Sequence, residues 1–329
     1  MELFRALGSL IEAPSPEQVR VAAALGLPAA PSPAEHGRVV GQQRYPYASV
    51  YLGAEGMLGG EARARIAGFR RALGLEGQPT GPSESGDGAS TGTVPSREPD
   101  HLAALLGLLA ALERWRREEA DPARMALLTQ ARTTLLWEHL TSWTGPFLAT
   151  FERCDSAFHR RWASLLEETL AHLCGDVEFP DYLPAALRAA PGFADPRREG
   201  GAAFIGALLA PVRSGQIVLR DDLERLGGDL GLACRAGERR YVLNAFLAQD
   251  PGRTLAWLAD HAAEWSRRVA AKGPPPIAAW WSKRAADMSA LLKELAAEAQ
   301  PGSTTRPPDP AMDDAGSRGD RSASTRTVQ

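Results

Sequence analysis

The stretch from Glu98 to Glu118 constrains the fold most, because it carries the clearest helical pattern in the chain. Its leucines recur every three or four residues and would form one apolar stripe on a helix, namely Leu102, Leu105, Leu106, Leu109 and Leu112. Pro99 suits a first helical turn, where its missing N–H costs nothing, and Asp100 would face the positive end of the helix dipole. The pattern predicts a helix that buries its body in a core and presents an acid and an imidazole, Asp100 and His101, at its N-terminal end.

The rest of the chain repeats this helical pattern and predicts an all-α fold. Apolar residues at spacings of three and four, bounded by Ser, Asp, Pro or Gly, predict helices in two blocks. The first block comprises residues 2–12, 15–26, 61–74, 98–118, 121–143 and 155–173, and the second comprises residues 201–210, 221–231, 237–249, 252–270 and 277–299. Only residues 216–219 resemble a strand, so strands do not alternate with the helices.

Two polar stretches divide the chain. Residues 76–97 are mostly Gly, Ser, Thr and Pro with almost no large apolar side chains, which predicts a flexible linker or insertion. The last thirty or so residues are also polar and are predicted to be disordered. We therefore expect an N-terminal helical part (1–75), the linker (76–97), a second helical part (98–199), a helical extension (200–299) and a disordered tail (300–329).

Composition limits the functions that the chain can have. A net charge of −3 argues against a general nucleic-acid binder, which normally has a basic excess. The cysteines are three, they are scattered, and no C-x-x-C pair occurs, so we expect no metal site and no cofactor. The chain starts without a secretory signal, and no uncharged apolar run reaches the roughly 20 residues that cross a bilayer. These features predict a cytoplasmic protein without stable membrane insertion.

The residues leave two other functions open. Residues 217–247 could form the helix–turn–helix of a transcriptional regulator, although the acidic start at Asp221 and Asp222 disfavours contact with DNA. Asp100 and His101 could act as an acid–base pair in an enzyme, but no nucleophile, metal-ligand set or cofactor loop accompanies them. We therefore expect that the protein is not an enzyme.

Three short motifs resemble a known family. They are P-Y-A-S-V-Y-L at residues 46–52, E-P-D-H-L at residues 98–102, and E-H-L at residues 138–140 followed by Trp143 and Phe147. In order and approximate spacing they are similar to the TorD/DmsD redox-enzyme maturation chaperones, which are all-helical cytoplasmic proteins that attend molybdenum enzymes of the dimethyl-sulfoxide-reductase type. The resemblance covers roughly the first half of the chain and does not include the linker or the helical extension.

The resemblance implies a TorD-like helical bundle and a non-catalytic chaperone. Such a protein binds the catalytic subunit of a molybdoenzyme and its twin-arginine signal peptide, and it delays export until the molybdenum cofactor is inserted. The resemblance implies no nucleic-acid partner and leaves open whether the protein is a monomer or a homodimer. By the same resemblance, the peptide site would be formed by Pro46, Tyr47, Ser49, Tyr51, Asp100 and His101.

The chemistry of two of these residues suits a twin-arginine peptide. Asp100 can pair with a guanidinium through two parallel hydrogen bonds, and Tyr47 can stack on it or on the apolar stretch beside it. The alternative is that Asp100 only caps its helix and Tyr47 only fills the core.

Overall fold

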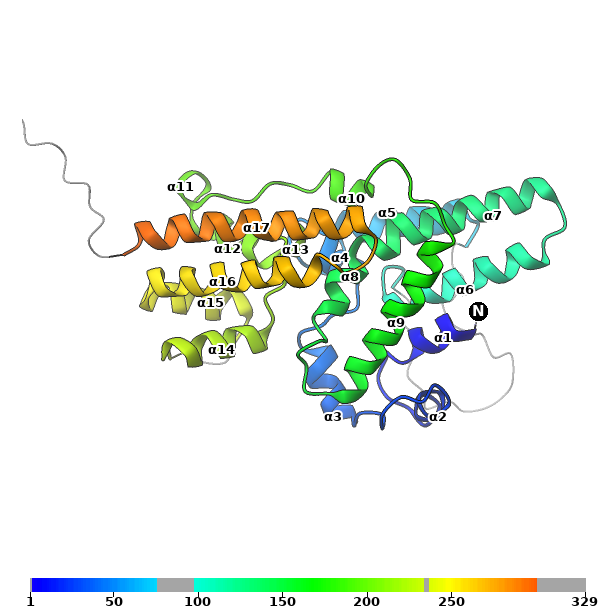
Figure 1. The fold of residues 1–329 in the computed structure, drawn as a ribbon, viewed down its shortest axis with the longest axis horizontal. Helices are drawn as coiled ribbons and strands as arrows, with labels where there is room; N and C mark the ends of the chain where they lie inside the picture. The colour runs from blue at the N-terminus through cyan, green and yellow to red at the C-terminus, as the bar shows by residue number, and fades with distance from the viewer. Residues whose placement is uncertain (1, 76–97, 234–236, 301–329) are drawn as a thin grey trace, which may run out of the picture.

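The computed structural model describes residues 2–75, 98–233 and 237–300, and this part of the chain consists of helices joined by turns and loops, without β-strands. The all-α class predicted from the periodicity is thereby confirmed (Figure 1). The predictions for the linker (76–97) and for residues 301–329 of the tail lie outside the described residues.

The longer helices lie close to the segments predicted from the apolar periodicity, and several short helices that were not predicted lie between them. Before the linker they are α1 (Glu2–Ser9), α2 (Pro16–Ala24), α3 (Pro33–His36), the π-helix η1 (Gly37–Gly41), α4 (Ala48–Leu52) and α5 (Gly60–Ala72). After it come α6 (Leu102–Glu118), α7 (Pro122–Thr134), the π-helix η2 (Leu135–Leu140), α8 (Thr141–Ala149), α9 (Ala157–Gly175), α10 (Ala185–Arg188) and α11 (Pro196–Glu199). The extension contains α12 (Gly201–Leu209), α13 (Pro211–Ser214), α14 (Arg220–Leu230), α15 (Arg239–Gln249), α16 (Pro251–Val269) and α17 (Pro275–Glu298).

Three boundaries differ from the prediction. The helix expected from Pro99 begins at Leu102, because the backbone of the preceding residues bonds to another segment, described below. The helix expected over 121–143 changes into the π-helix η2 after α7, and the chain then continues as α8, which contains Pro146. The strand-like residues 216–219 form no strand and instead lead into α14.

The first core is centred on a set of packed aromatic rings. Trp143, Trp162, Phe147 and Phe151 are fully buried and come from α8, α9 and the turn between them. The Trp143 ring is 5.4 Å from that of Phe147, and the Trp162 ring is 5.5 Å from that of Phe151. The indole N–H of Trp162 donates to the carbonyl of Leu7 at 2.9 Å, so it also holds α1 against this core.

The extension has a second core but is anchored in the first. Helices α16 and α17 form a long antiparallel pair that projects from the rest of the molecule (Figure 1). Near the turn between them, both helices bury side chains in the first core: Trp265, Val269, Ile277, Trp281 and Ala285. Toward the other end the same two helices pack with α12, α14 and α15 around the second core.

Candidate functional site

The first two motifs lie side by side in the structure. The N–H of Ala48 donates to the carbonyl of Asp100 at 2.9 Å, and the N–H of Leu102 donates to the carbonyl of Pro46 at 2.8 Å. These bonds form an isolated antiparallel bridge between Tyr47 and His101. Residues 46–49 and 98–102 are therefore one structural unit, which we call the motif junction.

Asp100 caps a helix, but not the one that follows it. One carboxylate oxygen, Oδ2, accepts the N–H of Ser49 at 3.1 Å, in the first turn of α4. The helix α6 is capped instead by His101, whose Nδ1 accepts the N–H of Ala103 at 3.2 Å. The expectation that Asp100 faces the N-terminus of its own helix is wrong, because the junction turns its side chain toward α4.

Burial sets the charge state of His101. Its side chain is 5% exposed, and desolvation lowers its pKa to about 4. The ring is therefore neutral at pH 7, which its role as an acceptor at Nδ1 requires. The Tyr47 ring meets it edge-on, with centroids 4.8 Å apart.

Tyr47 is the most exposed of the six predicted site residues. It is half-buried, whereas Pro46, Ser49, Asp100 and His101 are buried around it. Neither of the two pockets described between helices, one between α14 and α15 and one beside α5, α6 and α7, is lined by these residues. A ligand from solvent would therefore meet Tyr47 before it reached Asp100.

The structure places Tyr51 apart from this cluster. Its ring stacks on Trp143 at 5.2 Å and packs edge-on against Phe147 at 5.5 Å, within the first core. Burial raises the pKa of its hydroxyl, so the side chain is uncharged. The side chain of Ser49 stabilises the segment that follows α4. Its Oγ accepts the N–H of Gly59 at 3.1 Å and so links the junction to the glycine-rich turn before α5.

The third motif supports the core and not the junction. Glu138 Oε2 accepts the N–H of Ala185 at 2.7 Å, and the carbonyl of His139 accepts the indole N–H of Trp143 at 2.8 Å. The His139 ring packs against Phe69, and burial together with the charge of Arg65 lowers its pKa to about 4. Among the described residues no three His, Cys, Asp or Glu side chains gather as a metal site would require.

One buried residue beside the junction, Arg44, was not predicted from the sequence. Arg44 is 3% exposed and donates to the carbonyls of Val39 and Thr150 at 3.1 and 3.2 Å. Its guanidinium also lies 3.5 Å from a carboxylate oxygen of Asp221, at the start of α14. No local pattern could have revealed it, because every one of these contacts except that to Val39 joins distant parts of the chain.

The helices and the motif junction belong to an all-α fold, which is consistent with the TorD-like bundle that the motifs predict. The family model described as nitrate reductase delta subunit matches residues 39–149, so this segment of the chain is similar to that family. The match spans all three motifs and confirms the resemblance over about a third of the chain.

Two further comparisons and one property of the helices complete these findings. No match was found among curated proteins or among solved structures. Each helix in the described part of the chain is too short or too polar to cross a membrane.

Proposed function

We propose that this protein is a non-catalytic chaperone of the cytoplasm that binds a molybdoenzyme apoprotein through its twin-arginine signal peptide and assists cofactor insertion before export. The peptide site is the motif junction, with Tyr47 at its surface and Asp100 beneath. The matched family supports a molybdoenzyme partner, and the chemistry of the junction supports recognition of an arginine.

The observation that carries the proposal is that the Asp100 carboxylate is buried with few hydrogen-bond donors. It is 1% exposed, and among the described residues only Ser49 donates a hydrogen bond to it. A buried carboxylate with a single donor is poorly compensated, and a guanidinium can supply two further charge-assisted hydrogen bonds. Because the adjacent His101 is neutral, it does not compete for this charge.

Asp100 is 1% exposed, so a peptide reaches its carboxylate only if side chains around the junction move. Tyr47 is half-buried and contacts His101 edge-on, and a change of its rotamer leaves the backbone bonds of the junction intact. The displaced ring can then stack on the bound guanidinium or on the apolar stretch of the peptide.

A peptide titration tests the site. The probe is a synthetic peptide with two adjacent arginines followed by an apolar stretch. Asp100→Asn keeps an oxygen for the Ser49 N–H but removes the charge, and we expect it to weaken binding about tenfold. Asp121→Asn is the matched control, because Asp121 also caps a helix but is exposed and is separated from the junction by the 17 residues of α6. Equal affinities of the wild type and Asp100→Asn would refute the site.

A pull-down tests the partner. The wild-type protein is used as bait in its native cytoplasm, with the Asp100→Asn variant in parallel, and retained proteins are identified by mass spectrometry. We expect the wild type to retain a molybdoenzyme catalytic subunit with an uncleaved twin-arginine leader and the variant to retain less. Recovery of a molybdoenzyme without a leader would keep the chaperone role and overturn the signal-peptide site.

A further inference from the structure

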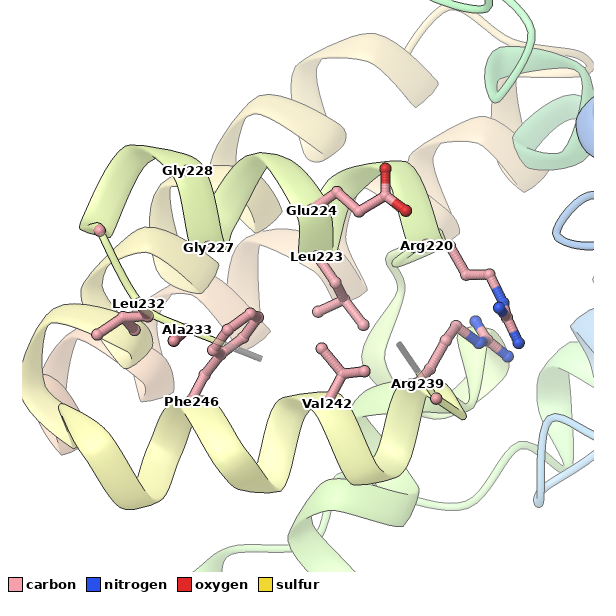
Figure 2. A pocket seen from close by; sticks show the side chains of 12 residues that line it. Arg220, Leu223, Glu224, Gly227, Gly228, Leu232, Ala233, Arg239, Val242 and Phe246 are labelled. Carbon is pink, nitrogen blue, oxygen red and sulfur yellow. The ribbon is translucent and has the colours of Figure 1, made fainter. Parts of the chain in front are cut away.

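A pocket of about 550 Å³ lies between α14 and α15 in the extension, outside the segment matched by the family model (Figure 2). Its walls are apolar along most of their length. Leu223 comes from α14, whereas Val242 and Phe246 come from α15, and Figure 2 shows these side chains facing one another across the gap. Gly227 lets the Phe246 ring lie against α14, since a Cβ at this glycine would be 3.0 Å from the ring.

One end of the pocket is cationic. Arg220 and Arg239 begin the two helices, and Figure 2 shows their guanidinium groups at the same end of the gap. The charge of Arg220 contributes to lowering the pKa of Arg239, after the larger effect of burial, so the two cations are close to each other. Exposed Glu224 also lines the pocket, which leaves a surplus of positive charge among the described lining residues.

These two arginines have no carboxylate partner among the residues that the structure describes. Arg239 donates to the carbonyl of Val218 at 2.7 Å, and the nearby hydroxyls of Tyr45 and Tyr51 only partly offset the lowering of its pKa by burial. A carbonyl and neutral phenols do not neutralise a half-buried guanidinium. By contrast, the nearby Arg225 on α14 is paired with Asp222 at 2.9 Å.

We propose that this pocket binds a small amphiphilic anion, with its apolar body between α14 and α15 and its carboxylate or phosphate group on Arg220 and Arg239. The size of the pocket and its apolar walls with a few convergent polar groups are typical of small-molecule sites. Two guanidinium groups favour a carboxylate or phosphate, which accepts paired hydrogen bonds, and repel a cation. Because Asp221, next to Arg220, is hydrogen-bonded to Gln43 at 2.8 Å and lies 3.5 Å from Arg44, the ligand would be bound close to the contact between the extension and the residues before the first motif.

Calorimetric titration of the full-length protein tests this proposal with four probes of equal chain length. They are decanoate, decyl phosphate, decanol and decyltrimethylammonium, each below its micellar concentration. We expect one molecule of decanoate or decyl phosphate to bind, and the preferred head group identifies the kind of anion. Equal binding of decanol, or stronger binding of the ammonium compound, would overturn the assignment of an anionic ligand.

Three variants locate the binding. Arg220→Gln should weaken binding of the anionic probes about tenfold and leave the weaker binding of decanol unchanged. Val242→Trp should fill the gap and abolish binding of all four probes. Arg267→Gln is the matched control, because Arg267 is exposed on α16 and does not line the pocket. Anion binding that survives both Arg220→Gln and Val242→Trp would refute the site, whatever the result of the peptide titration at Asp100.

Discussion

Asp100 joins two motifs through its side chain, and the two roles proposed for it can be separated by mutation. Its Oδ2 accepts the buried N–H of Ser49, so Asp100→Ala removes the cap of α4 and leaves a buried donor unpaired. We expect this change to lower the free energy of unfolding by about 1–3 kcal/mol. Asp100→Asn should cost less, because its amide oxygen can still accept the bond. Urea unfolding of the two variants measures the difference, and equal losses would show that the charge, and not the cap, stabilises the junction.

Buried imidazoles make the fold sensitive to acid. Desolvation lowers the pKa values of His101, His139 and His159 to about 4, from an ordinary value of 6.5. Between these values the unfolded chain binds protons that the folded chain does not. The contribution of these imidazoles to the free energy of unfolding is therefore fully present above pH 6.5 and is lost as the pH falls toward 4. When the pH has fallen to about 4, each fully buried imidazole has lowered the free energy of unfolding by on the order of 3 kcal/mol.

Urea unfolding at several pH values between 7 and 4.5 measures this loss. His159 is 0% exposed and stacks on Phe151, so His159→Phe keeps a ring in place while it removes one titrating group. We expect this variant to show a shallower pH dependence than the wild type. His172→Phe is the control, because His172 is exposed on the same helix, α9, and its replacement should leave the slope unchanged. Parallel slopes for all three proteins would contradict the assignment.

At the level of elements, α8 lies in direct contact with the turn between α16 and α17. A Cβ at Gly145 would be 2.5 Å from the carbonyl oxygen of Lys272, and backbone cannot move aside as a side chain can. Lys272 is itself held by Glu152 and Glu167, at 2.7 and 2.9 Å. Glycine at position 145 therefore permits the close approach of the extension.

Gly145→Ala should destabilise the protein by about 1–3 kcal/mol, the usual cost of overpacking a core. Gly68 is the matched control, because it also lies inside a helix but a Cβ there would contact nothing within 4 Å. Gly68→Ala should be neutral or stabilising by up to about 1 kcal/mol, since alanine restricts the unfolded chain. Thermal unfolding of both variants measures the difference between their stabilities. The two variants would be equally stable if α8 and the turn between α16 and α17 were not in contact.

The helices could be predicted from the sequence more completely than the contacts between them. Helices α16 and α17 each bury a stripe of their own side chains, so the periodicity that predicts them is present in the local sequence. That periodicity is the same whether Trp281 enters one core or another, so its place in the first core could not be inferred. Likewise the motifs pointed to residues 46–52 and 98–102, but the bond from Ser49 to Asp100 joins residues 51 positions apart and leaves no local pattern.

At the level of the whole molecule, the shared core couples the extension to the family segment. Trp281 is fully buried beside α8, and its indole N–H donates to the carbonyl of Ser142 at 3.0 Å. Ion pairs from Arg268 and Lys272 to Glu152 reinforce the same contact. A domain that depends on side chains from another segment for its core cannot unfold separately from it, so we expect one cooperative transition in urea.

Trp281→Ala tests this coupling. It should destabilise the whole protein by about 3–5 kcal/mol while preserving a single transition, because the cavity opens in the core that both parts share. The neighbouring Trp280 is half-buried and covered on one face by Arg284 at 4.7 Å, so Trp280→Ala should cost much less. Far-ultraviolet circular dichroism, which reports all helices, and tryptophan fluorescence should give coincident unfolding curves for the wild type. Two separate transitions would mean that the extension folds alone and that its pocket can be occupied independently of the motif junction.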